Sequence, residues 1–181
     1  MMIGSMTIGN IIIGQKEYKI RRLSGENVIE VQSLCERCSD FSELTEGRPP
    51  EACAGNDILF DLPLGKELKD KYVFGVFNEK DVLIAVIDLV KDYKVIGEWI
   101  IGLLMIDPSE RGNGLGRKIH ELIMNWVSKE KGRKLRIGVV EENYRGYQFW
   151  REMGYFEIDR VKSTYGNKEH TVIVMNVLIN E

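Results

Sequence analysis

The sequence predicts a mixed α/β domain, and three observations lead to that prediction. Apolar runs of strand length alternate along the chain with runs of helical spacing. Residues 99–140 have the order strand, helix, strand, which places two strands parallel with a right-handed crossover. The last two apolar runs, residues 155–161 and 171–178, flank a turn at Gly166 and Asn167. The expected order is therefore strand, helices, three strands, helix, strand, helix and two strands.

The N-terminal part of this order begins with a strand and a helix. Residues 18–23 alternate apolar and polar side chains, as a half-buried strand does. Ser24 is the expected N-cap of a helix that runs to about Asp40, and Asn27 is the alternative cap. Residues 41–71 contain repeated glycine and proline, so short helices and loops are expected there. Long irregular segments of this kind often bind ligands.

The middle of the chain contains the strongest periodic signals. Two of its strands are joined by a tight polar turn, and a second hairpin follows over residues 91–97. The apolar face that begins at Leu115 predicts a helix that stops near Gly132. The remaining elements are three strands over residues 72–78, 82–90 and 99–106, another strand over residues 135–140, and a helix over residues 143–153.

Composition sets the broad class of the protein. The chain has 181 residues, 44% hydrophobic and 29% charged, which fits a single folded domain over residues 1–181, with residues 1–16 as an extension or an extra strand. The net charge of -3 argues against nucleic-acid binding, because such proteins usually carry a strong positive balance. No apolar run approaches the roughly 18 residues of a membrane span, and no signal peptide is evident.

The cysteines predict a reducing, cytoplasmic location and no metal site. The chain has three cysteines, Cys35, Cys38 and Cys53, and its sequence shows no secretory signal. Cys35 and Cys38 have CxxC spacing, but a zinc site needs about four ligands and the chain has only His120 and His170 besides. The spacing also falls inside an expected helix. Free thiols on that helix are therefore the preferred interpretation.

A glycine-rich loop carries the main chemical signal. Arg111, Gly114 and Gly116 are spaced R-x-x-G-x-G between a strand and a helix. Glycines let backbone N–H groups approach a ligand, and a helix N-terminus attracts anions, so a pyrophosphate fits this position. A Walker A loop is excluded because Arg117 and Lys118 follow Gly116, and the glycine spacing is not that of a Rossmann loop. A plain helix-capping turn is the alternative.

The surroundings of this loop resemble a known family. Residues 101–116 are an apolar strand, a proline and the R-x-x-G-x-G loop, as in the acetyl-CoA motif of the GNAT superfamily of N-acetyltransferases. Residues 143–155, NYRGYQFWREMGY, resemble the second motif of that family. The resemblance implies a central mixed sheet of about six to seven strands with flanking helices, splayed at its central parallel pair.

The resemblance also implies how acetyl-CoA would bind. The backbone of Leu104, Met105 and Ile106 would pair with the pantetheine arm, as an added strand does. Asn143 would hydrogen-bond the same arm. The loop amides would hold the pyrophosphate, and the second helix would wall the thioester. The implied loop residues are Arg111, Gly112, Asn113, Gly114, Leu115, Gly116 and Arg117, and the wall residues are Gly146, Phe149 and Trp150.

The chemistry implied is direct attack of a primary amine on the thioester in a ternary complex, with no metal. A backbone N–H near Met105 would stabilise the oxyanion. Many members carry a proton-donating tyrosine where this chain has Trp150, whose indole N–H is a poor acid. Tyr147 is the substitute candidate, with simple packing as the alternative. A glutamate that some members use falls at Gly138, so the candidate bases are Glu98, Glu141 and Glu142.

The acceptor amine is the most open point. A small molecule is the leading hypothesis, and a protein N-terminus or lysine is the second. A catalytically silent acyl-CoA-binding module is the third, because the usual tyrosine and glutamate are missing. The segment 41–71, with Asp57, Asp61 and Pro63, is expected to help form the acceptor pocket and to favour a cationic amine. The expected assembly is a monomer or a homodimer.

Overall fold

The computed structural model describes residues 6–179, and an eight-stranded sheet in the order β1-β2-β3-β4-β5-β6-β8-β7 runs through it. Neighbouring strands are antiparallel except β5 and β6, which are parallel. The predicted mixed α/β class and its parallel central pair are confirmed. The strands are β1 (Thr7–Ile13), β2 (Lys16–Arg22), β3 (Lys71–Phe77), β4 (Leu83–Val90), β5 (Glu98–Ile106), β6 (Lys134–Val140), β7 (Phe156–Tyr165) and β8 (Lys168–Leu178).

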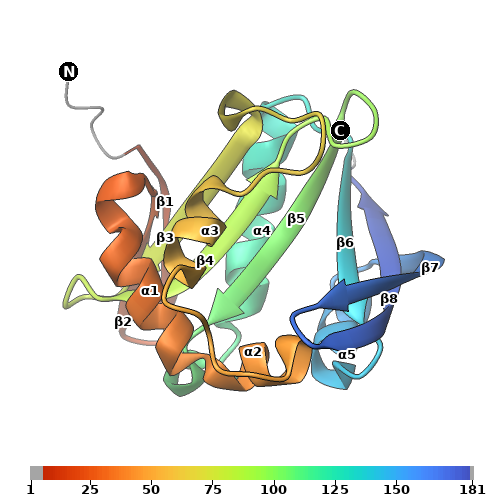
Figure 1. The fold of residues 1–181 in the computed structure, drawn as a ribbon. Coiled ribbons are helices and arrows are strands. Elements are labelled where there is room, and N and C mark those ends of the chain that lie inside the picture. The colour runs from red at the N-terminus through yellow and green to blue at the C-terminus, as the bar shows by residue number, and fades with distance from the viewer. Residues whose placement is uncertain (1–5, 180–181) are drawn as a thin grey trace.

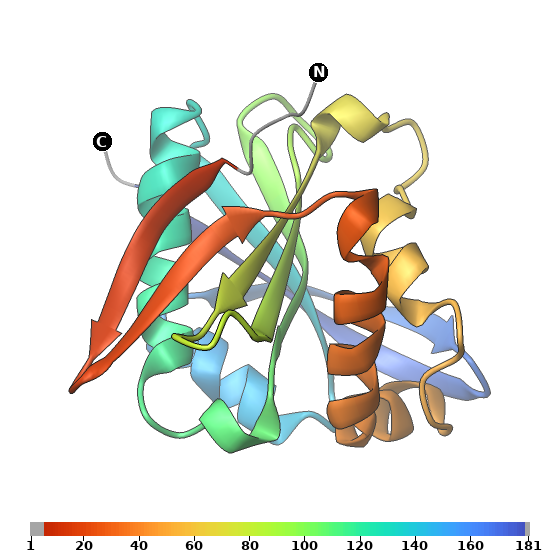
Figure 2. The ribbon, with the colours of Figure 1, turned by 90° about the vertical axis from the view of Figure 1, so that its left-hand side faces the viewer.

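The N-terminal strand β1 extends the sheet beyond the six to seven strands expected from sequence. It pairs with β2 and lies beside α4, where a Cβ on Gly9 would come within 2.6 Å of Leu122 Cδ1. Figure 2 shows this hairpin at one edge of the molecule, next to α4. Of the two alternatives for residues 1–16, the extra strand is therefore present over residues 7–13; residues 1–5 lie outside the described part of the chain.

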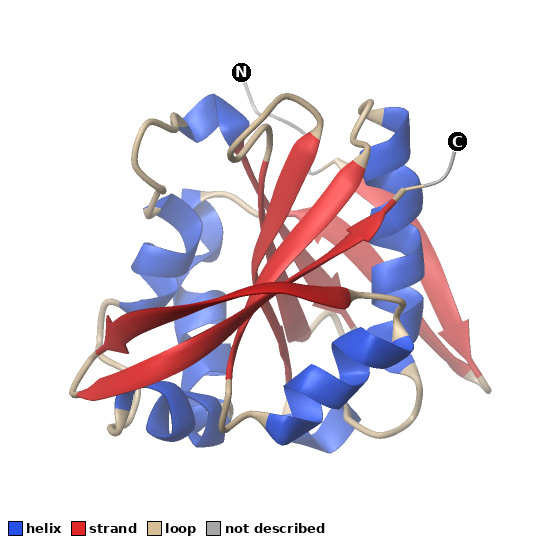
Figure 3. Cartoon of the chain, turned by 90° about the vertical axis from the view of Figure 1, so that its right-hand side faces the viewer, coloured by secondary structure: helices blue, strands red, loops and turns tan. Residues whose placement is uncertain are grey.

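Five α-helices cover the two faces of the sheet (Figures 1 and 3). α1 and α3 pack on one face, where their apolar residues join those of β3 and β4. α4 packs on the other face together with α5. Short 3-10 turns cover Gly25–Asn27, Leu68–Asp70 and Pro108–Glu110. The helices are α1 (Val28–Arg37), α2 (Ser39–Glu46), α3 (Ala54–Phe60), α4 (Leu115–Lys129) and α5 (Tyr144–Glu152).

The first predicted helix is wrong in its extent. The chain forms a 3-10 turn, then α1, and then the separate helix α2 after a break at Cys38. Ser24 caps the 3-10 turn, and the Asn27 side chain accepts a hydrogen bond from the Ser24 N–H, so the two candidate caps act together. The break matters for function because it turns α2 away from α1 and across the lower end of the sheet (Figure 1).

Continuous apolar runs form the central strands because both of their faces are covered by helices. Almost every residue of β3 and β4 is buried. β7, at the sheet edge, is instead exposed along nearly its whole length. None of the helices within residues 6–179 is long and apolar enough to cross a membrane.

The sheet opens at its parallel pair. β5 and β6 are paired only from Glu98 to Ile100, opposite Lys134 to Arg136. Beyond these residues the two strands diverge toward the lower end of Figure 1. The other edge of β5 stays paired with β4 up to Ile106. One edge of β5 and one edge of β6 therefore face each other without strand pairing, as the predicted splay requires.

Candidate functional site

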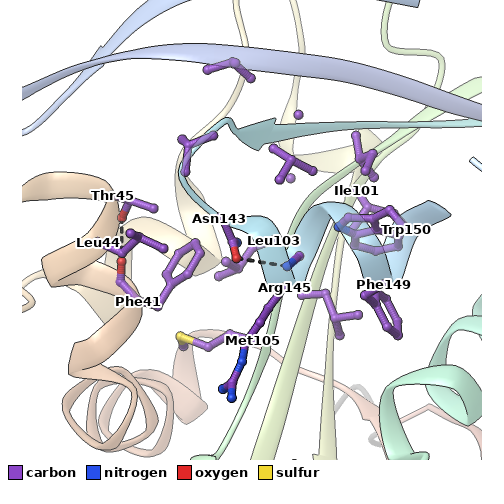
Figure 4. Close-up of a pocket in the computed structure, with 18 of the residues that line it drawn as sticks. Phe41, Leu44, Thr45, Ile101, Leu103, Met105, Asn143, Arg145, Phe149 and Trp150 are labelled. Carbon is purple, nitrogen blue, oxygen red and sulfur yellow. Dashed lines mark hydrogen bonds between the residues drawn. The ribbon is translucent and has the colours of Figure 1, made fainter. Parts of the chain in front are cut away.

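A cleft of about 530 Å³ occupies the opening between β5 and β6. Its floor is formed by the unpaired halves of the two strands, and its walls come from α2, α5 and the β7–β8 hairpin (Figure 4). The side chains are mostly apolar. The lining residues are Asp40, Phe41, Leu44, Thr45, Glu46, Ile101, Gly102, Leu103, Leu104, Met105, Ile106, Arg111, Ile137, Gly138, Val139, Val140, Asn143, Arg145, Gly146, Phe149, Trp150, Tyr165 and Val172.

A β-bulge shapes the β5 side of this cleft. Asp88 of β4 pairs with Leu103 and Leu89 pairs with Ile101, so Gly102 is left as an extra residue. Leu104, Met105 and Ile106, the residues expected to pair with a pantetheine arm, all line the cleft. The carbonyl of Ile106 is engaged, because it accepts a hydrogen bond from Arg111 Nε at 2.8 Å. Because the Asp107 N–H pairs with the Ile84 carbonyl, strand alternation turns the backbone groups of Met105 toward β4 and those of Leu104 and Ile106 toward the free edge, where Leu104 is the better placed for a strand-like ligand.

The glycine loop has the backbone conformation of an anion site. Gly112 and Gly114 have φ angles of 80° and 88°, a region that favours glycine, and Gly114 is the N-cap residue of α4. The Asn113 side chain accepts from the N–H of Leu115 at 3.1 Å. Within residues 6–179, no internal hydrogen bond is formed by the N–H groups of Gly112, Asn113, Gly114, Gly116 and Arg117. Several donors at a helix N-terminus are thus free for an anionic ligand.

The two arginines of the loop differ in their partners. Arg111 turns toward α2 and forms a two-point ion pair with Asp40 at 2.5 and 3.1 Å. Hydrogen bonds from Arg111 hold the pKa of the Asp40 carboxyl below its ordinary value. Arg117 is more exposed, and its only ion-pair partner in the described chain is Glu152 at 3.8 Å. Arg111 therefore links the loop to α2, while Arg117 is loosely held.

α5 forms the other wall of the cleft. Asn143 caps this helix, and its Oδ1 accepts from the Gly146 N–H at 2.9 Å. A Cβ on Gly146 would lie 2.6 Å from Asn143 Nδ2, so glycine is required there. Phe149 and Trp150 extend the wall, and Gly116 permits α4 to approach, since its Cβ would lie 3.1 Å from the Phe149 ring. Gly146, Phe149 and Trp150 all line the cleft, and Figure 4 shows Phe149 and Trp150 on the same side of it.

Behind this wall lies a buried aromatic cluster. Trp150 is 8% exposed and contacts the rings of Phe149, His120 and Tyr155. His120 Nε2 lies 3.1 Å from the Tyr155 hydroxyl. Burial lowers the pKa of His120 to about 4, so its ring is neutral at pH 7. Burial also raises the pKa of Tyr155 well above its ordinary value. These groups form a rigid support for the wall.

Of the four residues predicted for catalysis, only Trp150 lines the cleft. Glu98 is 3% exposed and lies at the paired end of β5, 2.7 Å from Lys134 Nζ. Glu141 is ion-paired to Arg160 at 2.6 Å on the surface. The Tyr147 hydroxyl lies 3.5 Å from Arg151. The structure therefore does not bring Glu98, Glu141 and Tyr147 to the cleft, and Glu142, the third candidate base, contacts His170 instead.

The α2 side of the cleft is formed by other residues than those expected for an acceptor pocket. Asp57, Asp61 and Pro63 are not among the lining residues, whereas α2 contributes five, from Asp40 to Glu46. Tyr165 and Arg145 line the cleft as well. No sequence signal separates these residues from ordinary surface groups, because α2 reaches the cleft only through the break after α1. Among residues 6–179, no three metal-ligating side chains are grouped as a metal site.

This geometry can be compared with known proteins. The model of the acetyltransferase (GNAT) family matches residues 36–155, which include the splayed strands, the glycine loop and α5. The chain belongs to the GNAT acetyltransferase family. Membership of this family places the chain in the acyltransferase class of enzymes. The GNAT match begins at the end of α1 and stops at Tyr155, so β1, β2, β7 and β8 lie outside it.

Solved GNAT structures extend the likeness over most of the chain. The ribosomal-protein-S18-alanine N-acetyltransferase of Escherichia coli is 15% identical, with a TM-score of 0.68 over 91% of this chain and 95% of its own. The spermidine N-acetyltransferase of Vibrio cholerae, solved with CoA and spermine, is 18% identical, with a TM-score of 0.70 over 90% and 95%. The GNAT domain of S. lividans PAT is 14% identical, with a TM-score of 0.70 over 94% and 96%.

At these identities the solved structures establish the GNAT fold and nothing narrower. A search of curated protein sequences returns no match.

Proposed function

We propose that this GNAT protein is an N-acetyltransferase that moves an acetyl group from acetyl-CoA to a primary amine in a ternary complex. The observation that supports the proposal most directly is the continuity of the cleft with the glycine loop. A pantetheine arm laid along the free edge of β5 would lead its pyrophosphate to the unpartnered N–H groups at the start of α4. The structure of the spermidine N-acetyltransferase relative contains CoA.

The proposed chemistry uses few side chains. The amine nitrogen attacks the thioester carbonyl to form a C–N bond, the nitrogen gives its surplus proton to water, and the C–S bond breaks to release CoA as a thiolate. The N–H near Met105 is the proposed oxyanion donor. Trp150 is assigned to pack against the acyl arm, because its indole cannot serve as an acid near neutral pH. The thiolate is therefore proposed to leave unaided or to take its proton from water.

The amine is proposed to enter in its neutral form. The two carboxylates that line the cleft are Asp40 and Glu46. Asp40 is paired with Arg111, which lowers its pKa and makes it a weak base. Glu46 is paired with Arg48 at 3.4 Å. An α-amine with a pKa near 8 supplies more neutral form at pH 7 than a lysine amine near 10.4. Acceptors of lower pKa are thus favoured.

We propose a small molecule as the acceptor. The cleft is of ligand size, about 530 Å³, and its α2 side is lined by Phe41 and Leu44. A peptide or protein amine is the second candidate, and the relatives include both kinds of enzyme. A silent acyl-CoA-binding module is the third. Thiol release measured with a panel of small amines and peptides separates the three, because the silent module releases none.

Location and assembly complete the proposal. We propose a cytoplasmic protein, since Cys35, Cys38 and Cys53 are all unpaired thiols. Monomer and homodimer remain the proposed assemblies, and sedimentation velocity distinguishes them.

Calorimetric titration with acetyl-CoA tests the cofactor proposal. Gly112 has a positive φ and open space around its Cβ position, so Asp and Asn both fit there. Gly112→Asp adds a negative charge beside the proposed pyrophosphate site and should weaken binding at least tenfold, about 1.4 kcal/mol. Gly112→Asn has the same shape without the charge and should bind nearly as the wild type does. Equal affinities for the two variants would refute this site.

A further inference from the structure

The short turn before the glycine loop is held at both ends by side chains from distant parts of the chain. This turn is the 3-10 segment Pro108–Glu110, between β5 and Arg111. At its start, Asp107 Oδ2 lies 2.6 Å from Arg37 Nε of α1. The other carboxylate oxygen of Asp107 accepts hydrogen bonds from the N–H and the hydroxyl of Ser109. The first end of the turn is therefore fixed to α1.

The β1–β2 hairpin holds the second end of the turn through Glu110. Glu110 Oε2 accepts hydrogen bonds from the Tyr18 hydroxyl at 2.7 Å and from Lys16 Nζ at 3.3 Å. Glu110 and Tyr18 are both buried, whereas the Lys16 side chain is largely exposed. A hydrogen bond to a buried carboxylate contributes strongly, because the charge would otherwise lose part of its solvation without compensation. Tyr18 is therefore the main partner of Glu110.

The Tyr18 hydroxyl also lies close to the glycine loop itself. Burial and the Glu110 carboxylate raise the pKa of Tyr18 to about 12, although the nearby Asn113 side chain lowers it. The hydroxyl therefore keeps its proton at neutral pH and donates it to Glu110. Asn113 Oδ1 in turn accepts from the N–H of Leu115, in the first turn of α4, at 3.1 Å. Polar contacts thus connect Tyr18 to both ends of the loop.

These contacts matter because the loop is rich in glycine. Gly112 and Gly114 can adopt many backbone conformations, so their N–H groups converge on a ligand only if the flanking residues are fixed. Glu110 lies just before these glycines, and Leu115 lies just after them. In Figure 2 the β1–β2 hairpin runs beside α4 toward the end where the loop lies. Donors that are ordered in advance bind an anion without the entropic cost of ordering them.

Glu110 is suited to hold the loop and not to contact the ligand. A carboxylate repels a phosphate group, so a direct contact between Glu110 and a pyrophosphate would weaken binding. Neither Glu110 nor Tyr18 is among the residues that line the cleft. Both residues can therefore affect a bound ligand only through the backbone of the loop.

We infer that Tyr18 is a positioning residue for the glycine loop: it holds Glu110, and Glu110 fixes the start of the loop so that the free N–H groups converge on a pyrophosphate. The inference rests on the proposed function in naming pyrophosphate as the ligand. Tyr18 and the β1–β2 hairpin lie outside the GNAT match, which covers residues 36–155. The N-terminal hairpin of this chain is thus assigned a part in cofactor binding.

Two ligands that differ in the pyrophosphate test this role. Tyr18→Phe removes the hydroxyl and keeps the ring. This variant should bind acetyl-CoA roughly three- to tenfold more weakly than the wild type, because binding must then order the loop. S-acetyl-pantetheine lacks the pyrophosphate, so its affinity should not change. NMR titration measures both ligands. Tyr72→Phe is the matched control, since Tyr72 packs against Trp99 and Trp126, and it should bind both ligands as the wild type does.

A conservative change of Glu110 separates its position from its charge. In Glu110→Gln the amide oxygen can still accept from the Tyr18 hydroxyl, so this variant should bind acetyl-CoA at least as tightly as the wild type. Three outcomes would overturn the inference. They are unchanged acetyl-CoA affinity in Tyr18→Phe, an equal loss for both ligands in that variant, and a loss in Glu110→Gln as large as that in Tyr18→Phe.

The order of the loop can be measured without any ligand. Backbone nitrogen relaxation gives order parameters for Gly112, Asn113 and Gly114. These values should fall in Tyr18→Phe and stay unchanged in Tyr72→Phe. Unchanged values in Tyr18→Phe would contradict the positioning role. A wild-type protein that does not bind acetyl-CoA would instead refute the proposed function, and the relaxation result would still report whether Tyr18 orders the loop.

Discussion

The only two histidines of the chain lie in different parts of the molecule, and they show how differently two buried rings can be surrounded. His120 and His170 are both buried, with 6% and 3% exposure. His120, behind the cofactor wall, contacts aromatic rings and a tyrosine hydroxyl, which do not compensate a charge. His170, on the β7–β8 side, has two polar partners, the Thr45 carbonyl and a carboxylate oxygen of Glu142. Burial alone therefore does not define the environment of a histidine, because two equally buried rings can face apolar or polar partners.

The largest expected loss of stability comes from truncation of Trp150, whose ring packs against that of His120. Trp150→Ala should lower the free energy of unfolding by about 3–5 kcal/mol, because a buried ring in contact with three others is lost. Urea denaturation at pH 7.5 measures this. Trp150→Phe keeps a ring and should lose less. A loss below about 1 kcal/mol for Trp150→Ala would mean that the wall is not part of the core.

The pH dependence of stability tests the neutral state of His120. The pKa of His120 is about 4 in the folded protein and about 6.5 in the unfolded chain. Only the unfolded chain binds this proton between those values, so the free energy of unfolding should fall by about 1.4 kcal/mol for each pH unit as pH drops from 6.5 to 4.

A matched variant isolates this contribution from that of the carboxylates. His120→Gln can still hydrogen-bond Tyr155 but does not titrate. The difference between the wild-type and His120→Gln slopes, from urea unfolding at several pH values, gives the His120 contribution. Identical slopes would show that His120 is not held neutral by burial.

Lys168 sharpens the comparison on the other side of the cleft. Lys168→Met removes the donor to the Glu43 and Leu44 carbonyls. The free energy of unfolding should fall by about 0.5–1.5 kcal/mol, because these hydrogen bonds are solvent-exposed. Lys19→Met, on the exposed face of β2, should change it by less than about 0.5 kcal/mol. Chemical denaturation of both variants decides whether the contact between Lys168 and the end of α2 contributes to global stability.

The smallest expected effect concerns the link between the two sides. Asp40 pairs with Arg111 of the glycine loop and, under the proposed function, would compete with the pyrophosphate for it. Asp40→Asn should strengthen acetyl-CoA binding roughly two- to fivefold, the size of a surface ion pair. Asp81→Asn makes the same charge change on a distant turn and should leave affinity unchanged. Calorimetry measures both, and weaker binding in Asp40→Asn would mean that Asp40 orients Arg111 instead.

The sequence by itself determined most of the fold and one side of the site. The apolar runs predicted where the central strands lie, because strands buried on both faces need uninterrupted apolar residues, as in β3 and β4. The glycine loop and the start of α5 could be predicted from the sequence, because their conformation depends on residues that are only a few positions apart. Gly112, Gly114 and the Asn143 cap are such local features.

Only the tertiary structure decided which residues form the α2 side of the cleft and which candidate bases lie away from it. Glu98 was a candidate by strand position, but Lys134 of the neighbouring strand pairs with it and buries it away from the cleft. His170 and Thr45 are separated by 125 positions in sequence, and nothing local to either predicts their contact. The physical reason is that backbone conformation follows from neighbours along the chain, whereas the charge and accessibility of a side chain follow from partners that only folding brings into contact.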